Sequence, residues 1–173
     1  AALFLLTFKW FTEGRRAAWL WMGVAMALMA YSKYHGALVV LFALAATPPR
    51  LFLRPTLYLS GAVPLLLLVP HFVWQYEHDW ASLAYHLAGR NSVFRPNYVA
   101  EYLLNLLVVF NPFFVPLYVK AWIAVKPQNA VERALRCMPA AFIVFFLLST
   151  LRGYVQPQWV IVAVFGLLYT LFT

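Results

Sequence analysis

Lys33 is the residue of this sequence whose type and position most suggest chemistry. It lies in the stretch YSKYHG, residues 31–36, between two apolar runs. A lysine at the turn of a short apolar hairpin can offer its ammonium to a phosphate at a membrane surface. Tyr34 and His35 add hydrogen-bonding groups beside it, and Gly36 permits close approach of the backbone. The alternative is that the Lys33 side chain only extends to lipid headgroups.

A second polar cluster, Glu77, His78 and Asp79, follows another apolar run. Carboxylate and imidazole groups in this arrangement can hydrogen-bond a sugar or share in proton transfer. Glu77 and Asp79 also offer the oxygen ligands that a divalent cation uses. A transition-metal site is not expected, because no cysteine is near and because His78 and His86 are too far apart for a standard pair on one helix face.

The residues after this cluster predict a short amphipathic helix on the membrane surface over 80–87. Its apolar positions recur at helical spacing: Trp80, Leu83, Ala84 and Leu87. Asp79 or Ser82 can cap this helix, and capping is the alternative to a functional role for Asp79.

Three arginines accompany these clusters, namely Arg90, Arg95 and Arg152. Arginine is the preferred residue for bidentate phosphate contacts, although binding to lipid headgroups explains it equally well. Gln158 and Trp159 open the last apolar segment, where they can hydrogen-bond and stack on a sugar. The alternative for Trp159 is a place in the aromatic belt at the membrane interface.

The composition places these residues in an integral membrane protein. Of the 173 residues 65% are hydrophobic and only 10% are charged, and the mean hydropathy is +0.78. The apolar stretches do not alternate with period two, so helices are expected. The net charge of +8 fits loop charges facing anionic headgroups better than nucleic-acid binding. The single cysteine, Cys137, excludes an internal disulfide framework.

Polar punctuation divides the chain into apolar segments, and we expect an all-α, polytopic transmembrane bundle of about six to seven membrane helices. The predicted segments are 1–10, 17–31, 37–47, 56–74, 99–124, 138–151 and 159–173, with an interruption of 99–124 at Asn111-Pro112 and Pro116. The arms 17–31 and 37–47 would measure roughly 16–22 Å, shorter than a hydrocarbon core of about 30 Å. Lys33 is therefore expected in a water-filled cavity below the outer surface.

The positive-inside rule predicts how the charges are sorted. The loops assigned to the inside contain Lys9, Arg15, Arg16, Arg50, Arg54, Lys126, Arg133 and Arg136, with Lys120 nearby. The outside retains only Lys33, Arg90, Arg95 and Arg152. The same outer face is predicted to hold His35, His71, His78, His86, Glu77, Asp79 and Glu101. Ionisable groups gathered at membrane depth indicate a functional site, and the alternative is solvation of loops.

The chain resembles the bacterial polytopic glycosyltransferases related to protein O-mannosyltransferases and lipid A aminoarabinose transferases, which have the membrane fold called GT-C. The resemblance is carried by LMAYSKYHGALVVLFAL, PHFVWQYEHDWASLAYHL, KPQNAVERALR and RGYVQPQW. The Lys-x-x-Gly hairpin is similar to the Lys-Gly helix turn of that family, with Tyr34 and His35 inserted. On this resemblance, residues 1–173 are expected to be a partial transmembrane glycosyltransferase domain without the first periplasmic loop and the C-terminal part.

The resemblance implies transfer of a sugar from a polyprenyl-phosphate carrier to a protein, lipid or glycan on the periplasmic face of the bacterial inner membrane. A carboxylate base assists the attacking hydroxyl, and cations stabilise the departing lipid phosphate. The aspartate that serves as base in the family lies in the first periplasmic loop, so the base of this protein is unknown, and Glu77 and Asp79 are only accessory candidates. No cofactor is expected apart from the divalent cation that Glu77 and Asp79 can bind.

Two other functions fit parts of the pattern. A transporter or flippase of an anionic lipid or lipid-linked sugar would also use cations and a proline-broken helix, but it would place polar groups near the midplane. A structural membrane subunit would not require Glu77, His78, Asp79 and Arg90 in one loop.

Overall fold

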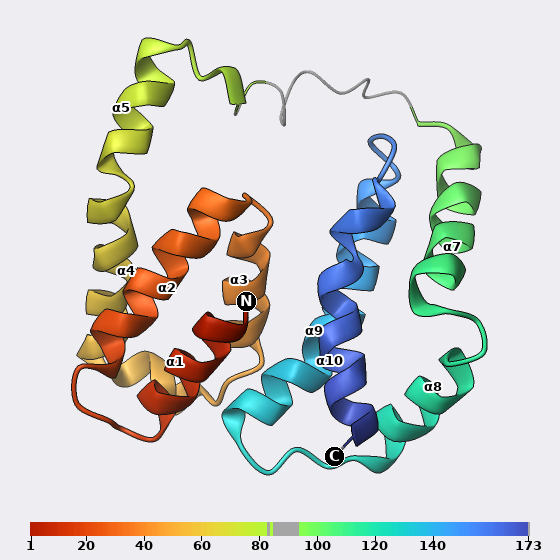
Figure 1. The fold of residues 1–173 in the computed structure, drawn as a ribbon, viewed down its shortest axis with the longest axis horizontal. Helices are drawn as coiled ribbons and strands as arrows, with labels where there is room; N and C mark the ends of the chain where they lie inside the picture. The colour runs from red at the N-terminus through yellow and green to blue at the C-terminus, as the bar shows by residue number, and fades with distance from the viewer. Residues whose placement is uncertain (83, 85–93, 173) are drawn as a thin grey trace. The chain divides into compact units, whose positions relative to one another are not determined.

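The computed structural model describes residues 1–82, 84 and 94–172, and the regular elements among them are all helices (Figure 1). The prediction of an all-α protein is confirmed for these residues. The chain divides into two compact units, Ala1–Leu87 and Ala88–Thr173. Each unit is described separately below.

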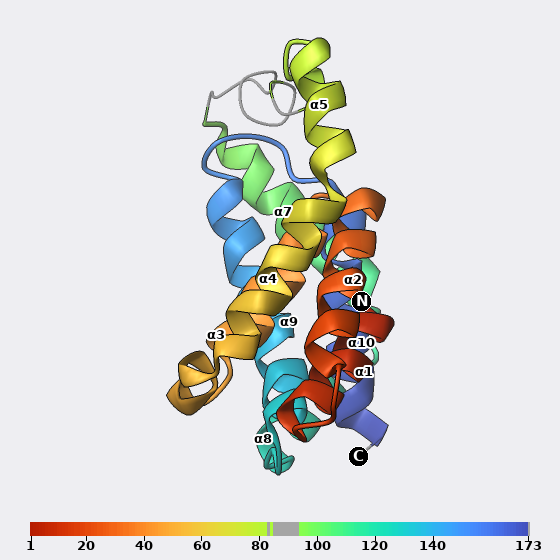
Figure 2. The same cartoon turned by 90° about the vertical axis from the view of Figure 1, so that its left-hand side faces the viewer.

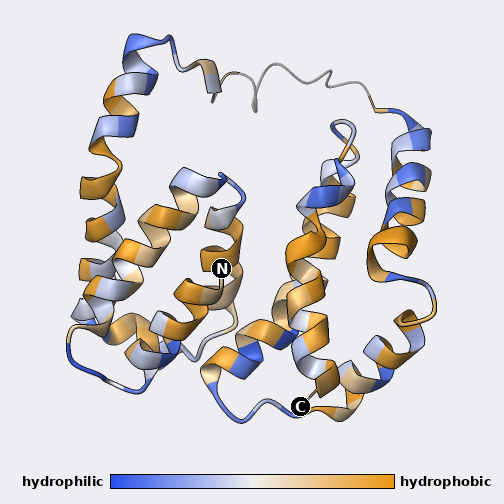
Figure 3. Ribbon diagram, viewed as in Figure 1, coloured by the Kyte–Doolittle hydropathy of each residue, from blue (hydrophilic) through white to orange (hydrophobic). Residues whose placement is uncertain are grey.

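The N-terminal unit is arranged around helix α2, which contacts α1, α3 and α4. Its elements are α1 (Ala2–Thr12), α2 (Ala18–Ser32), α3 (Gly36–Ala45), the 3-10 helix η1 (Pro49–Leu53), α4 (Pro55–Leu67) and α5 (Val69–Glu77). The buried core includes Phe4, Phe8, Met22, Val39 and Ala43. Figure 3 shows hydrophilic residues at the two ends of α2 and towards the end of α5, so polar groups collect where helices stop.

The C-terminal unit packs α10 against α9 and α8. Its elements are α7 (Pro96–Phe110), α8 (Val115–Ala124), α9 (Ala130–Ser149), the 3-10 helix η2 (Pro157–Trp159) and α10 (Ile161–Phe172). Gly166 permits the close approach of α10 to α9, because a Cβ there would lie 2.5 Å from the Leu135 carbonyl oxygen.

Prolines break two of the predicted helical segments. The segment predicted over 56–74 consists of α4 and α5, which meet at Leu68 with a bend of 44° (Figure 2). Pro70 has no N–H for the helix ladder, and its ring crowds the preceding turn. The segment predicted over 99–124 bends by 81° between α7 and α8. Asn111, at φ 55°, ends α7 just before Pro112, so the predicted interruption at this site is confirmed.

The lengths and apolar character of the helices bear on whether they can cross a membrane. Among the described residues, each helix alone falls short of the length or the apolar character needed to cross one, whereas α4 with α5 and α7 with α8 meet both conditions as bent pairs.

Candidate functional site

Opposite ends of the N-terminal unit hold different sets of polar residues. At one end, Arg54 Nη1 donates to the Phe11 carbonyl oxygen at 3.0 Å, which places the start of α4 beside the end of α1. At the other end, the Tyr31 hydroxyl donates to the Leu67 carbonyl oxygen at 2.8 Å, which places the end of α2 beside the α4–α5 break. The arginine-rich loops and the Lys33 turn therefore lie at opposite ends of α2.

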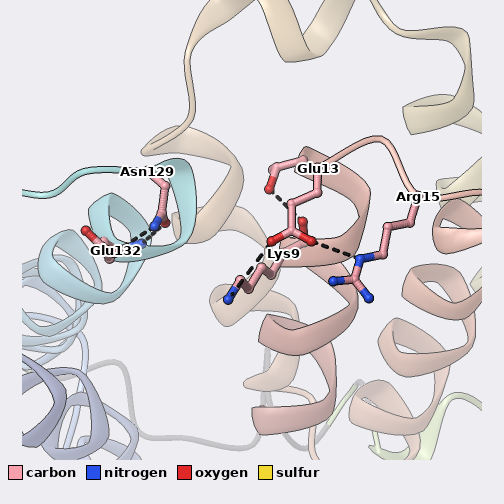
Figure 4. A network of polar contacts seen from close by, with 6 residues as sticks. Lys9, Glu13, Arg15, Asn129 and Glu132 are labelled. Atoms are coloured by element: carbon pink, nitrogen blue, oxygen red, sulfur yellow. Dashed lines mark hydrogen bonds and ion pairs between the residues drawn. The ribbon is translucent and has the colours of Figure 1, made fainter.

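The arginine-rich end contains the two ion pairs found among the described residues. Glu13 lies 2.9 Å from Arg15 Nε and 4.0 Å from Lys9 Nζ (Figure 4). All three side chains are well exposed, so each pair contributes little to stability. The acid does, however, offset part of the positive charge at this end.

The α2–α3 turn presents Lys33 to solvent. The Lys33 amide donates to the Met29 carbonyl oxygen at 2.9 Å, and the Lys33 carbonyl oxygen accepts from the Gly36 amide at 2.8 Å. A side chain at Gly36 would approach the Met29 carbonyl oxygen within 2.9 Å, so the turn needs glycine. Lys33 is exposed and makes no ion pair with a described residue. Its ammonium is therefore available to an anion.

Beside this turn, Tyr34 joins two polar side chains of α5. The Tyr34 hydroxyl lies 3.2 Å from His71 Nε2 and accepts a 2.8 Å hydrogen bond from Gln75 Nε2. Gln75 Nε2 also lies 3.4 Å from His71 Nε2. Gln75 is only 3% exposed, and its Oε1 is buried without a hydrogen-bond partner among the described residues. We call Tyr34, His71 and Gln75 the turn–α5 cluster.

Aromatic rings surround His71. The Tyr31 ring is 5.8 Å from the His71 ring in an edge-to-face arrangement, and the Trp74 ring is 6.3 Å away and nearly parallel to it. Tyr31, Tyr34 and Trp74 remain 51%, 40% and 45% exposed. Exposed aromatic faces beside converging polar groups are typical of sites for small polar ligands.

The α4–α5 break and the turn are linked by Tyr31. Pro70 has no amide hydrogen for the Leu66 carbonyl group, and the bend at Leu68 interrupts the helix ladder, so carbonyl groups near the break need other donors. The Tyr31 hydroxyl is the donor to the Leu67 carbonyl oxygen. The Tyr34 hydroxyl contacts His71 of α5 one turn further along. The bend of α4 and α5 therefore sets where His71 and Gln75 meet the Lys33 turn.

Glu77, His78 and Asp79 lie at the end of α5 and are exposed. The Trp80 amide donates to the Gln75 carbonyl oxygen at 2.7 Å, and Asp79 has φ 50°, as in a Schellman ending. His78 stacks on Trp74 with ring centres 4.3 Å apart, and its Nδ1 lies 2.8 Å from the Trp74 carbonyl oxygen. Asp79 and His78 thus take part in ending α5.

A metal site receives no support from the described residues, in which no group of three His, Cys, Asp or Glu side chains could hold a metal ion. Ala81, Ser82 and Ala84 are helical, as expected within the segment 80–87. His86 and Arg90, and the rest of that segment, lie outside the described residues.

In the C-terminal unit, Arg95 and Arg152 lie at the same end. Arg95 precedes the first turn of α7, and Arg152 is exposed in the turn after α9. The Tyr98 and Tyr154 rings, 6.1 Å apart, connect these two segments. The predicted pairing of these two arginines with Lys33 and Glu77 crosses from one unit to the other, so it stays a prediction.

Gln158 and Trp159 have different surroundings. Gln158 is exposed, and its Nε2 donates to Gln156 Oε1 at 2.8 Å. Trp159 is 9% exposed, and its ring centre lies 5.7 Å from that of Phe146. The Trp159 ring therefore belongs to the core of this unit, whereas Gln158 is open to a ligand.

Sequence reasoning placed His71 on the outer face but did not single it out for the site, and it missed Gln75 and Tyr31. His71 and Gln75 are four residues apart on α5, so they share one helix face. That spacing could have indicated the pair. It was overlooked because the helix was expected to end at Trp74, which would leave Gln75 in a loop.

Comparison of the chain with protein-family models, with curated proteins and with solved structures finds no match.

Proposed function

We propose that this chain is part of a polytopic, GT-C-like glycosyltransferase of the bacterial inner membrane. It would transfer a sugar from a polyprenyl-phosphate carrier to a protein, lipid or glycan at the periplasmic face. The observation that carries the proposal is Lys33, which is exposed, makes no ion pair with a described residue and lies at the end of α2 opposite the arginine-rich loops. A cation that departs from the charge sorting of a membrane protein suggests an anionic substrate.

In this reaction an acceptor hydroxyl attacks the anomeric carbon of the lipid-linked sugar. The new oxygen–carbon bond forms as the bond between the anomeric carbon and the phosphate oxygen breaks, and the configuration inverts. The hydroxyl proton passes to a carboxylate, and the electron pair leaves with the lipid phosphate. The Lys33 ammonium would stabilise that phosphate. The residue that acts as base is not identified, while Glu77 and Asp79 are assigned accessory roles.

A transporter of an anionic lipid or lipid-linked sugar is the second candidate. The 81° break between α7 and α8 favours it, because broken helices form the substrate sites of many transporters. The break itself contains Asn111, Pro112, Phe113 and Phe114 and no charged residue. The break thus lacks a charged side chain for an anionic substrate, whereas Lys33 lies at a helix turn, which supports the enzyme over the transporter.

Replacement of Lys33 tests the enzymatic proposal. We expect Lys33→Ala in the full-length protein to lower the rate of transfer from polyprenyl-phosphate-linked sugars by about a hundredfold or more, because a lost charge contact to a leaving phosphate removes several kcal/mol of stabilisation. The measurement is transfer of radiolabelled sugar from the lipid donor in reconstituted vesicles.

The matched control is Lys126→Ala, which removes an exposed lysine from a loop assigned to the inside. It should leave the transfer rate and the amount of inserted protein unchanged. Full turnover in Lys33→Ala at a normal protein level would remove Lys33 from the mechanism. Movement of an intact lipid-linked sugar across the bilayer, without transfer, would favour the transporter.

A further inference from the structure

We propose that the turn–α5 cluster is a sugar subsite, in which Gln75, His71 and Tyr34 bind hydroxyl groups of the lipid-linked donor. This inference rests on the proposed function and extends it. It assigns the sugar to residues next to the lysine that is assigned to the phosphate.

Gln75 has one amide atom without a hydrogen-bond partner among the described residues. The side chain is 3% exposed, and its Nε2 is used by Tyr34 while its Oε1 has no partner among the described residues. If the amide is turned over, its oxygen accepts from Tyr34 instead and its nitrogen loses the partner. In either orientation one polar atom of Gln75 remains without a bond. Leaving such an atom unpaired costs about 1–3 kcal/mol.

Three kinds of group can pair with this atom: a hydroxyl, a phosphate or a water molecule. A hydroxyl both donates and accepts, so it satisfies either orientation of the Gln75 amide. A fully ionised phosphate only accepts, so it fits one orientation alone. A buried water molecule has the same versatility as a hydroxyl and is the competing occupant.

Other polar and aromatic groups lie beside the Gln75 side chain. His71 uses Nε2 towards Tyr34 and Gln75, and its Nδ1 has no hydrogen-bond partner in the described part of the chain. The half-exposed Tyr31 and Tyr34 side chains add apolar surface on which the C–H groups of a sugar ring can lie. The site therefore combines polar and aromatic contacts suited to a polyol.

Lys33 lies in the same turn as Tyr34 of the cluster. Lys33 and Tyr34 are adjacent, with Cα atoms about 3.8 Å apart. In the donor, the sugar is bonded directly to the phosphate. We therefore assign the phosphate to the long Lys33 side chain and the sugar bonded to it to the cluster beside the same turn.

The test measures binding to the full-length protein in lipid nanodiscs. The probes are polyprenyl phosphate without a sugar and the same lipid carrying mannose, glucose or aminoarabinose. Wild-type protein should bind at least one sugar-bearing lipid about tenfold more tightly than the bare lipid, and Gln75→Met should reduce that ratio to about one. Gln128→Met, which changes an exposed glutamine in the C-terminal unit, should keep the ratio.

Three outcomes would overturn the subsite. These are equal affinity of the wild-type protein for all four lipids, an unchanged ratio in Gln75→Met, and an equal loss for every lipid together with a lowered unfolding temperature. The last result would indicate that Gln75 has a structural role or holds a water molecule. The phosphate contact is read separately from Lys33→Ala. If that variant binds the bare lipid normally while Gln75→Met loses the ratio, the phosphate contact assigned to Lys33 fails and the sugar contact assigned to Gln75 stands.

Discussion

Gln75 and Lys33 are two polar residues placed close to apolar helices in different ways. Lys33 remains exposed at a turn and avoids desolvation, whereas Gln75 is buried on α5 with one bond to Tyr34. Exposure leaves a cation ready for an anionic group. Burial makes each missing hydrogen bond of the amide more expensive. Both arrangements leave unused binding capacity, and both are found at the same end of α2.

Asn129 shows how one residue determines where a helix begins. Its Oδ1 accepts from the Glu132 amide at 3.0 Å (Figure 4). Glu132 Oε2 accepts from the Gln128 amide at 2.6 Å. These bonds satisfy amides at the start of α9 that the helix leaves free. Helix α9 therefore begins at Ala130, eight residues before the predicted start at 138.

Asn129→Ala should lower the free energy of unfolding by about 0.5–2 kcal/mol, because the helix N-cap is lost. The measurement is chemical unfolding of the purified protein in detergent, followed by circular dichroism. Gln128→Ala is the control, since only the backbone amide of Gln128 contributes to the cap. Equal losses in the two variants would show that the cap is unimportant.

At the level of helices, α2 and α4 pack closely because Gly23 has no side chain. A Cβ at Gly23 would lie 2.5 Å from Val63 Cβ and 2.7 Å from the Ser60 carbonyl oxygen. Small residues at helix contacts are typical of membrane bundles, where association depends on close packing. This contact fixes α2 against α4 and thereby positions Tyr31 near Leu67.

Gly23→Ala should destabilise the protein by about 1–3 kcal/mol, because the added methyl group forces the two helices apart. Thermal unfolding in detergent measures the effect. The matched control is Gly61→Ala on α4, where a Cβ meets no atom within 4 Å. That variant should be neutral or stabilise by about 0.5–1 kcal/mol, since alanine favours helix more than glycine does. A Gly23→Ala protein as stable as Gly61→Ala would contradict the close contact.

At the level of the whole chain, the two units sort their charges in the same way. In the N-terminal unit Lys33 lies at the end of α2 opposite Arg15 and Arg54. In the C-terminal unit the 20-residue helix α9 separates Arg136, near its start, from Arg152, just after its end.

The positive-inside rule predicts that Lys33 and Lys126 are accessible from opposite sides of the membrane. Variants are made in a Cys137→Ser background, which removes the one native thiol. Lys33→Cys should react with a membrane-impermeant maleimide added to intact spheroplasts, and Lys126→Cys should react only after the membrane is opened. The positive-inside rule gives the expected orientation. Labelling of both cysteines from one side would exclude this orientation. Labelling of Lys126→Cys alone in intact spheroplasts would indicate the reverse orientation.

Local physical rules predicted much of the fold. Both arms around Lys33 are helices close to the expected bounds, because apolar runs punctuated by polar and proline residues favour helices that stop at those residues. The break at Asn111 and Pro112 was predicted for the same reason. The start of α9 was missed, because Asn129 and Glu132 were interpreted as loop residues and not as a cap.

Composition and charge spacing in the sequence were enough to indicate an all-α chain and to single out Lys33, because hydropathy and proline act locally along the chain. Only the tertiary structure brought Tyr34 to His71 and Gln75, residues separated by 37 and 41 positions. Their meeting depends on the bend at Leu68 and on the close contact of α2 with α4. Whether a polar atom keeps an unmet hydrogen bond is decided by such distant neighbours, and a linear pattern does not record them.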